Sequence, residues 1–151
     1  MTQGAHMGPH MARLWHVPVL LSILWLHTRT AGETGRGWLS DAQLMAKVVL
    51  RKWVRFVRDE TGIAGFIMRD GARVHALYVH PRAQGHGVGR GLLNDAKTLS
   101  PRLELWTLQS NHLARAFYLA QGFSEVAHTA GEGNDEGLPD VCLVWQKEPQ
   151  P

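Results

Sequence analysis

The sequence predicts an α/β fold in which about four helices flank a mixed, mostly antiparallel sheet of six or seven strands. Three observations support this prediction: apolar residues at helical spacing near the N-terminus, consecutive strand-like segments joined by turn residues, and a strand, glycine loop, helix and strand in succession. The 151 residues are 44% hydrophobic, which is enough for one sizeable core. We therefore expect a single domain over residues 12–148.

Residues 1–11 (MTQGAHMGPHM) are rich in Gly, His and Met and lack periodicity, which predicts a disordered leader or a non-native remnant. The apolar run 17–26 (VPVLLSILWL) has helical spacing, and Pro18 suits the first turn of a helix. Because ten residues are too few to span a bilayer, we expect a buried first helix. Arg13 before the run and small residues after it are also typical of a signal peptide, so an exported or membrane-attached protein is an alternative.

Two further helices follow from local patterns. Ser40 with Gln43 has the form of a capping box and predicts the start of the second helix. Its buried face would consist of Leu44, Met45, Val48 and Val49. A third helix follows the glycine loop and carries an apolar stripe of Val88, Leu92, Leu93 and Ala96. Ser100-Pro101 should end it, because a residue before proline disfavours the helical conformation.

The strands are predicted by apolar segments between turn residues. Segments 53–59 and 62–70 read as strands joined by a tight turn, and Asp70-Gly71 predicts a second turn into residues 73–79, giving three antiparallel strands. Segment 103–111 follows the third helix and should lie parallel to the preceding strand. The last two strand candidates are residues 123–129 and 140–147.

The glycine loop between a strand and a helix predicts an anion site. Residues 84–89 (QGHGVG) fit the pattern Q/R-x-x-G-x-G/A. Gly87 and Gly89 remove side chains where the backbone must approach a ligand, and the first N–H groups of the helix converge there. These donors and the helix dipole would hold a pyrophosphate without a metal, with Arg90 adding a charged contact.

Other glycine motifs fit less well. The dinucleotide fingerprint would require glycine at position 90 or 92, where Arg90 and Leu92 stand, and no G-K-S or G-K-T follows as in a Walker loop. A glycine-rich turn that merely caps a helix is the remaining structural alternative.

The segments LYVHPRAQGHGVGRGLL (77–93) and NHLARAFYLAQGF (111–123) resemble the acetyl-CoA motif and the following helix of the GNAT superfamily of N-acetyltransferases. The resemblance implies the GNAT-like acyl-CoA N-acyltransferase fold and acetyl-CoA as cofactor. It also implies that the backbone of Leu77, Tyr78 and Val79 meets the pantetheine arm. Around the pyrophosphate it places Gln84, Gly85, His86, Gly87, Val88, Gly89 and Arg90. Members usually begin with a short strand, for which MARLWH (11–16) is a poor candidate.

Asn111 and Tyr118 are seven residues apart, which places them on one helix face, and the resemblance assigns this face to the thiol end of the cofactor. Direct attack of an amine on the thioester requires a stabilised leaving thiolate. Tyr118 is the catalytic candidate, because a phenol of pKa about 10 stays protonated at pH 7 and can donate to the thiolate. The alternative is a tyrosine that only packs beside Phe117.

The general base is not singled out by the sequence. A lysine-like amine must lose its proton before it attacks, so a base or a water chain is expected. His75 and His80 near the strand end and Glu136 and Asp140 in the final loop are the candidates.

The last loop is acidic and suggests a cationic substrate. Our candidates for substrate contact are Gln109, Asn134, Glu136 and Asp140. The segment GNDEGLPDVCLVW (133–145) also looks like a bacterial GNAT subgroup with N-(D/E)-E-x-x-P-D before the last strand. A solvated loop without a ligand is the structural alternative.

Composition narrows the functional classes. Sixteen Lys and Arg against 13 Asp and Glu, with no run of like charge, argue against nucleic-acid binding. The single Cys142 lies in an apolar run and fits a buried side chain in a reducing compartment, and we expect a cytoplasmic protein that does not bind membranes. Nine scattered histidines form no metal motif, so no metal is expected.

The sequence therefore predicts a cytoplasmic, acetyl-CoA-dependent N-acetyltransferase that acetylates a primary amine of a small molecule or a protein in a ternary complex. A non-catalytic CoA-binding or protein-interaction module on the same fold is the alternative, because fold does not fix function. The sequence leaves a homodimer open.

Overall fold

The computed structural model describes residues 8–31, 38–133 and 137–148. The chain forms two compact units, the first of Met1–Arg69 with Ala76–Asp95 and the second of Asp70–His75 with Ala96–Pro151. Hydrogen bonds join seven strands in the order β1-β2-β3-β4-β5-β7-β6, and β4 (Arg73–Val79) contributes residues to both units. The predicted α/β class is confirmed, and the described residues form a mixed sheet of seven strands with four α-helices.

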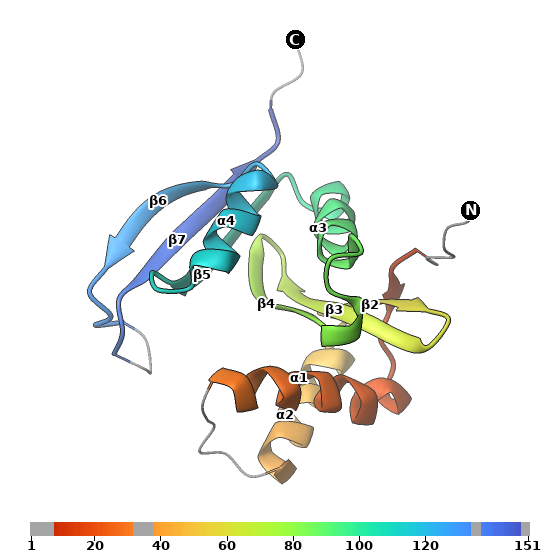
Figure 1. The fold of residues 1–151 in the computed structure, drawn as a ribbon. Coiled ribbons are helices and arrows are strands. Elements are labelled where there is room, and N and C mark those ends of the chain that lie inside the picture. The colour runs from red at the N-terminus through yellow and green to blue at the C-terminus, as the bar shows by residue number, and fades with distance from the viewer. Residues whose placement is uncertain (1–7, 32–37, 134–136, 149–151) are drawn as a thin grey trace. The chain divides into compact units, whose positions relative to one another are not determined.

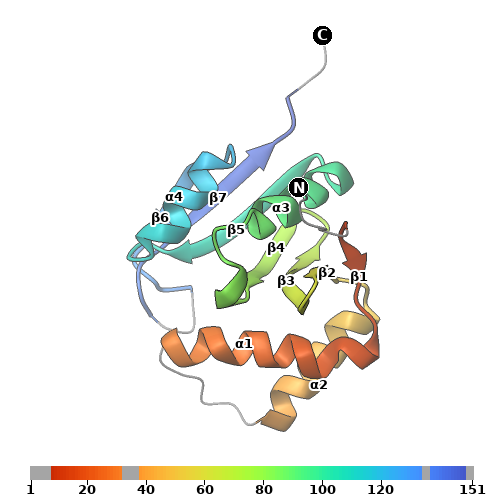
Figure 2. The ribbon, with the colours of Figure 1, turned by 45° about the vertical axis from the view of Figure 1, so that its right-hand side comes forward.

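The first unit contains two helices that lie on one side of three strands, with the first turns of α3 on the other side (Figures 1 and 2). Its elements are β1 (His10–Met11), η1 (Leu14–His16), α1 (Val17–Ala31), α2 (Trp38–Leu50), β2 (Val54–Asp59), β3 (Gly62–Asp70), the end of β4, η2 (Pro81–Ala83) and the start of α3 (Val88–Leu99). β2 and β3 are antiparallel, as predicted.

The core of this unit lies between the two helices and the strands. Leu20 and Ile23 of α1, Met45 of α2 and Phe66 of β3 are all at most 2% exposed. Removing such side chains from water stabilises the fold by about 1.5–3 kcal/mol each. The buried first helix is thus confirmed over residues 17–26, and it continues to Ala31.

The expectation of a disordered leader over residues 1–11 was wrong for its last residues. Residues 1–7 lie outside the described part, but His10 and Met11 of the expected leader form β1, which pairs with Phe56 and Arg55 of β2. The His10 ring also packs against Phe56 at 5.7 Å. This strand is made by tertiary pairing, and two residues are too short to show a sequence period.

The second helix begins earlier than its capping pattern indicated. Ser40 is the third residue of α2, so it cannot be the residue that caps its start. Met45, Val48 and Val49 are buried as predicted, whereas Leu44 is 45% exposed. A serine followed by glutamine at this spacing also fits an exposed helix face, where neither side chain has to cap.

Gly65 in β3 allows the backbone of β4 to come close. A Cβ at this position would lie 2.8 Å from the Tyr78 carbonyl oxygen and 3.0 Å from Cγ1 of Val88. Because the first of these atoms belongs to the backbone, any side chain would push the end of β4 away. Gly65 therefore fixes the strand end that leads into the glycine loop.

The second unit is built on the C-terminal strands. β5 (Arg102–Leu108) pairs in parallel with β4 at Glu104 and Arg73, as predicted, and antiparallel with β7 (Asp140–Gln146) along its whole length. β6 (Ser124–Thr129) pairs with the other edge of β7. Figure 2 shows α4 (His112–Ala120) against this group of strands.

None of the helices in the described part of the chain combines the length and the hydrophobicity that spanning a lipid bilayer requires. The expected single domain over residues 12–148 stays a prediction.

Candidate active site

The glycine loop has the backbone that an anion site needs. Gly85 and Gly87 adopt φ values of +81° and +82°, a region that side chains other than glycine rarely enter. The Gly87 carbonyl accepts from the Gly91 N–H at 2.9 Å, so α3 begins directly after Gly87. The first N–H groups of a helix have no intrahelical partner, and those of Val88 and Gly89 therefore lie at the loop.

The loop is held by buried side chains on both sides. Ala83 ends η2 and Val88 begins α3, and both are buried. His86 bonds through Nδ1 to the Ala83 carbonyl at 3.3 Å. Gln84, Gly85 and Gly87 between these anchors are exposed. The predicted arrangement of an exposed glycine loop at a helix start is therefore present.

The end of β4 carries two side-chain contacts that the sequence did not reveal. The Val79 carbonyl accepts from His27 Nε2 at 2.9 Å and from Gln84 Nε2 at 3.3 Å. The His27 ring packs on Tyr78 with centroids 4.8 Å apart, and burial raises the pKa of the Tyr78 phenol. Leu77, Tyr78 and Val79 are all half-buried, so this strand end is partly accessible.

Tyr118 lies on α4 in the second unit. Its ring packs edge-on against Phe117 at 5.1 Å and against Phe123 at 5.5 Å. The side chain is half-buried, so two aromatic neighbours fix its ring. Tyr118 can pack through its ring and still donate a hydrogen bond, because the donation needs only its hydroxyl group.

Asn111 is the N-cap of α4 and not a member of the helix. Its Oδ1 accepts from the Ala114 N–H at 3.1 Å. The expectation that Asn111 shares a helix face with Tyr118 is therefore wrong, because asparagine is preferred as the residue before the first turn. The Asn111 side chain is exposed, and its contact with the cofactor stays a prediction.

Gln109 and Asp140 tie the final loop to the sheet. Gln109 Nε2 donates to the carbonyls of Thr129 at 3.1 Å and Asp140 at 3.0 Å. The buried Asp140 carboxylate accepts from the Thr129 hydroxyl. Both side chains thus have structural roles, and their contact with substrate stays a prediction. Asn134 and Glu136 lie outside the described residues.

Two histidines were candidates for the general base. Burial, followed by the neighbouring Arg73, lowers the pKa of His75, so its ring is neutral near pH 7 and can accept a proton. His80 Nδ1 already accepts from the Arg82 N–H at 3.2 Å. Among the described residues, no group of three His, Cys, Asp or Glu side chains could hold a metal ion.

The chain is similar to proteins of known family. Residues 51–125 match the model of the acetyltransferase (GNAT) domain. The chain is 31% identical over 134 residues to the peptidyl-lysine N-acetyltransferase YiaC of Escherichia coli (strain K12), covering 85% of this chain and 90% of that protein. The chain belongs to the GNAT acetyltransferase family.

One more relative and one solved structure are similar to the chain. The peptidyl-lysine N-acetyltransferase YjaB of Salmonella typhimurium is 33% identical over 93 residues, which cover 62% of this chain and 63% of that protein. The structure of yncA from Salmonella typhimurium with its cofactor acetyl-CoA superposes with a TM-score of 0.70 at 18% identity, over 97% of this chain and 96% of that one. The second likeness shows a shared fold.

As a GNAT enzyme, the protein transfers an acetyl group from acetyl-CoA to a primary amine. Its glycine loop fits this cofactor, because a Cβ at Gly85 would meet no described atom within 4 Å and the helix start offers N–H donors. His27 was not predicted from the sequence. It lies one residue beyond the apolar run, and its contact with the Val79 carbonyl depends on the tertiary fold. Its histidine identity was the only available signal.

Proposed function

We propose that this GNAT enzyme acetylates lysine side chains of polypeptides. The observation that carries the proposal is the similarity to YiaC over 90% of that protein, whose name states a peptidyl-lysine acceptor. The glycine loop supports the cofactor half of the reaction, because Gly85 and Gly87 have the positive φ values of an open anion cradle. The match at residues 51–125 runs through both units, which supports one functional domain over 12–148.

In this proposal, separate groups of residues hold the diphosphate of the cofactor, orient its pantetheine arm and contact its thiol end. The N–H groups of residues 84–90 and the Arg90 guanidinium hold the diphosphate of acetyl-CoA, and the backbone of Leu77, Tyr78 and Val79 orients its pantetheine arm. Acetyl-CoA, when bound, supplies the activated thioester. The Asn111 side chain contacts the cofactor near its thiol end.

Proton handling falls to two kinds of group. The Tyr118 hydroxyl donates a hydrogen bond to the leaving thiolate, because an ordinary phenol, with a pKa of about 10, keeps its proton at pH 7. His75 is one candidate for the base that neutralises the acceptor amine, since its lowered pKa favours the neutral ring. His80, Glu136 and Asp140 are the other candidates.

The acceptor substrate is proposed to be cationic, because the loop that would contact it is acidic. Glu132 and the buried Asp140 flank a loop whose remaining acids lie at positions 135 and 136, and a lysine is attracted by such a charge. Gln109 and Asn134 complete the proposed substrate contacts. A cytoplasmic location and a homodimer stay predictions, the first resting on the single cysteine.

The test combines binding and turnover. A ligand at 100 times its dissociation constant stabilises a protein by about 2.7 kcal/mol, so saturating acetyl-CoA should raise the unfolding temperature. Lysine peptides should then release free thiol, measured with a thiol reagent, and mass spectrometry should place the acetyl group on the lysine side chain. Arginine peptides of otherwise identical sequence are the control.

The outcomes separate the proposals. Absence of any shift with acetyl-CoA contradicts the cofactor assignment. A shift without thiol release from lysine peptides or a panel of small amines favours a non-catalytic CoA-binding module. Release with small amines alone contradicts the polypeptide acceptor.

Replacing Asn111 distinguishes its capping role from its proposed cofactor contact. Asn111→Ala should lower the free energy of unfolding by about 1 kcal/mol, because an N-cap acceptor is lost. Asn111→Ser should restore the cap yet still bind acetyl-CoA several-fold more weakly, because the amide is gone. Chemical denaturation and calorimetric titration measure the two effects. Wild-type affinity in the serine variant would reduce Asn111 to a structural residue.

A further inference from the structure

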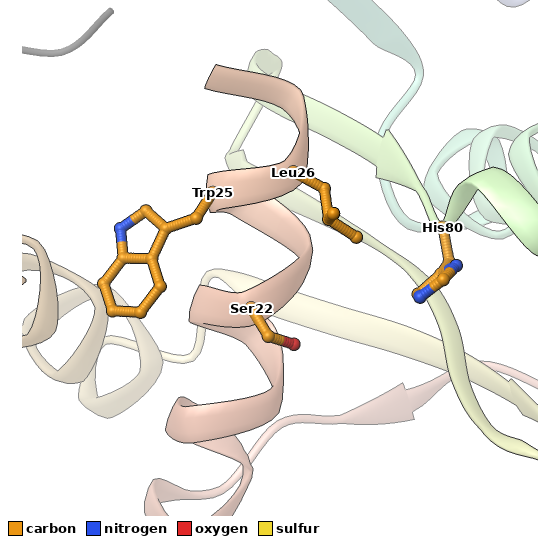
Figure 3. A pocket seen from close by; sticks show the side chains of 4 residues that line it. All are labelled: Ser22, Trp25, Leu26 and His80. Atoms are coloured by element: carbon orange, nitrogen blue, oxygen red, sulfur yellow. The ribbon is translucent and has the colours of Figure 1, made fainter. Parts of the chain in front are cut away.

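Two adjoining hollows lie beside α1 in the first unit. The larger has a volume of 360 Å³ and is bounded by the start of α1, the β2–β3 turn and η2. The smaller, of 280 Å³, shares Ser22 and His80 with it and continues to Trp25 and Leu26. Figure 3 shows Ser22 and Leu26 pointing from α1 toward His80. We call the two hollows together the α1 groove.

Two histidines of the α1 groove present hydrogen-bond donors. His80 Nδ1 accepts from the Arg82 N–H at 3.2 Å, and His16 Nδ1 accepts from the Arg13 N–H at 2.8 Å. A neutral imidazole carries one proton, so in each ring the proton must lie on Nε2. Both residues line the larger hollow, which therefore has two N–H donors among its walls.

Arg58 adds a positive charge to the same hollow. Its guanidinium stacks over Phe56 at 5.8 Å, and within the described part of the chain no carboxylate pairs with it. Together with the burial of the ring, Arg58 lowers the pKa of His16. The Arg58 guanidinium has no carboxylate partner among the described residues, and its charge disfavours a second positive charge on His16. An anionic group of a ligand would therefore be attracted to it.

The carboxylate of Asp59, the residue that follows Arg58 in the sequence, is already paired. Asp59 accepts from Arg82 Nη1 at 2.6 Å and from the N–H groups of Thr61 at 2.9 Å and Gly62 at 3.2 Å. The hydrogen bond from Arg82 is the main reason that the pKa of Asp59 is lowered. Its charge is therefore compensated within the turn, and no described residue lining either hollow is acidic.

We propose that the α1 groove binds an acidic side chain of the acceptor polypeptide, with Arg58, His16 and His80 donating to its carboxylate. This inference rests on the proposed function, because it requires a polypeptide acceptor. A carboxylate only accepts hydrogen bonds, which complements walls that donate. His80 directly follows the end of β4, and an extended chain advances about 3.3 Å per residue. The acidic residue should thus lie within a few positions of the acetylated lysine.

The test uses lysine peptides that carry one glutamate at each flanking position in turn, compared with the same peptides carrying glutamine. At one position, KM should be about tenfold lower with glutamate at unchanged kcat, because the charge strengthens the hydrogen bonds. In Arg58→Ala this difference should vanish, while KM for the glutamine peptide stays the same. Arg51→Ala is the matched control, since Arg51 also stacks on a ring, that of Trp53, but does not line the groove.

Equal KM values for glutamate and glutamine peptides at every position would overturn the inference. It would also be overturned if Arg58→Ala weakened both peptides alike. Fluorescence anisotropy of labelled peptides on the protein saturated with CoA separates this inference from the proposed function. Glutamate-dependent binding that needs Arg58, without any turnover, would support the groove and contradict the acetylation of lysine. Turnover of lysine peptides without glutamate-dependent binding would support the acetylation of lysine and contradict the role of the groove.

Discussion

Gly87→Asp should abolish the binding of acetyl-CoA at ordinary concentrations. The new carboxylate would stand where the diphosphate is expected, and two like charges about 4 Å apart repel by roughly 4 kcal/mol near a protein surface. This energy corresponds to roughly a thousandfold weaker affinity. The φ of +82° adds strain, because side chains are disfavoured there. Calorimetric titration with CoA measures the effect.

Gly71→Asp is the control for backbone strain. Gly71 lies in the β3–β4 turn at φ +59°, and an added Cβ would meet no atom within 4 Å. This variant introduces the same residue at positive φ, outside the glycine loop. It should lose some stability and keep its affinity for CoA. If Gly87→Asp binds CoA as the control does, the loop does not hold the diphosphate.

Tyr118→Phe should lower kcat by a factor of about 100 to 10,000, the usual range for loss of an acid–base group. Affinity for acetyl-CoA and the melting temperature should change little, because the ring keeps its edge-on contacts with Phe117 and Phe123. The loss should be smaller with acyl donors whose leaving thiolate needs less stabilisation. Steady-state thiol release and calorimetric titration provide the measurements.

Phe117→Leu tests whether the aromatic packing alone matters. It removes one ring neighbour of Tyr118 while leaving the hydroxyl in place, so it should affect stability more than kcat. Wild-type turnover in Tyr118→Phe would assign Tyr118 to packing. A large fall in kcat for Phe117→Leu alone would indicate that the ring position matters more than its proton.

The parts of the fold that depend on local signals were predictable. The glycine loop shows this at Gly87, which was expected to free the backbone and adopts a φ of +82°, whereas the second glycine at positive φ is Gly85 and not the expected Gly89. The turn at Gly71 was recognised for the same reason. Helix α1 was predicted from its apolar spacing over residues 17–26, but its continuation to Ala31 was not, because residues 27–31 (HTRTA) carry no apolar periodicity.

Features made by tertiary contact were not predictable. β1 exists because His10 and Met11 meet β2, which lies more than 40 residues along the chain. The groove donors His16, Arg58 and His80 come from three separate segments, and each alone reads as a surface residue. Asn111 was predicted to belong to the helix but is its cap, and a cap and a first helical residue differ by a single position in the sequence.

The Val79 carbonyl has a consequence for how affinity is divided over the length of the cofactor. Both of its lone pairs already receive hydrogen from side chains, one from His27 and one from Gln84. A pantetheine amide arriving at this oxygen would exchange one partner for another, so its net gain would be small. Most of the affinity for the cofactor should therefore come from its phosphates, and the contact of the pantetheine arm with the Val79 carbonyl should serve orientation more than affinity.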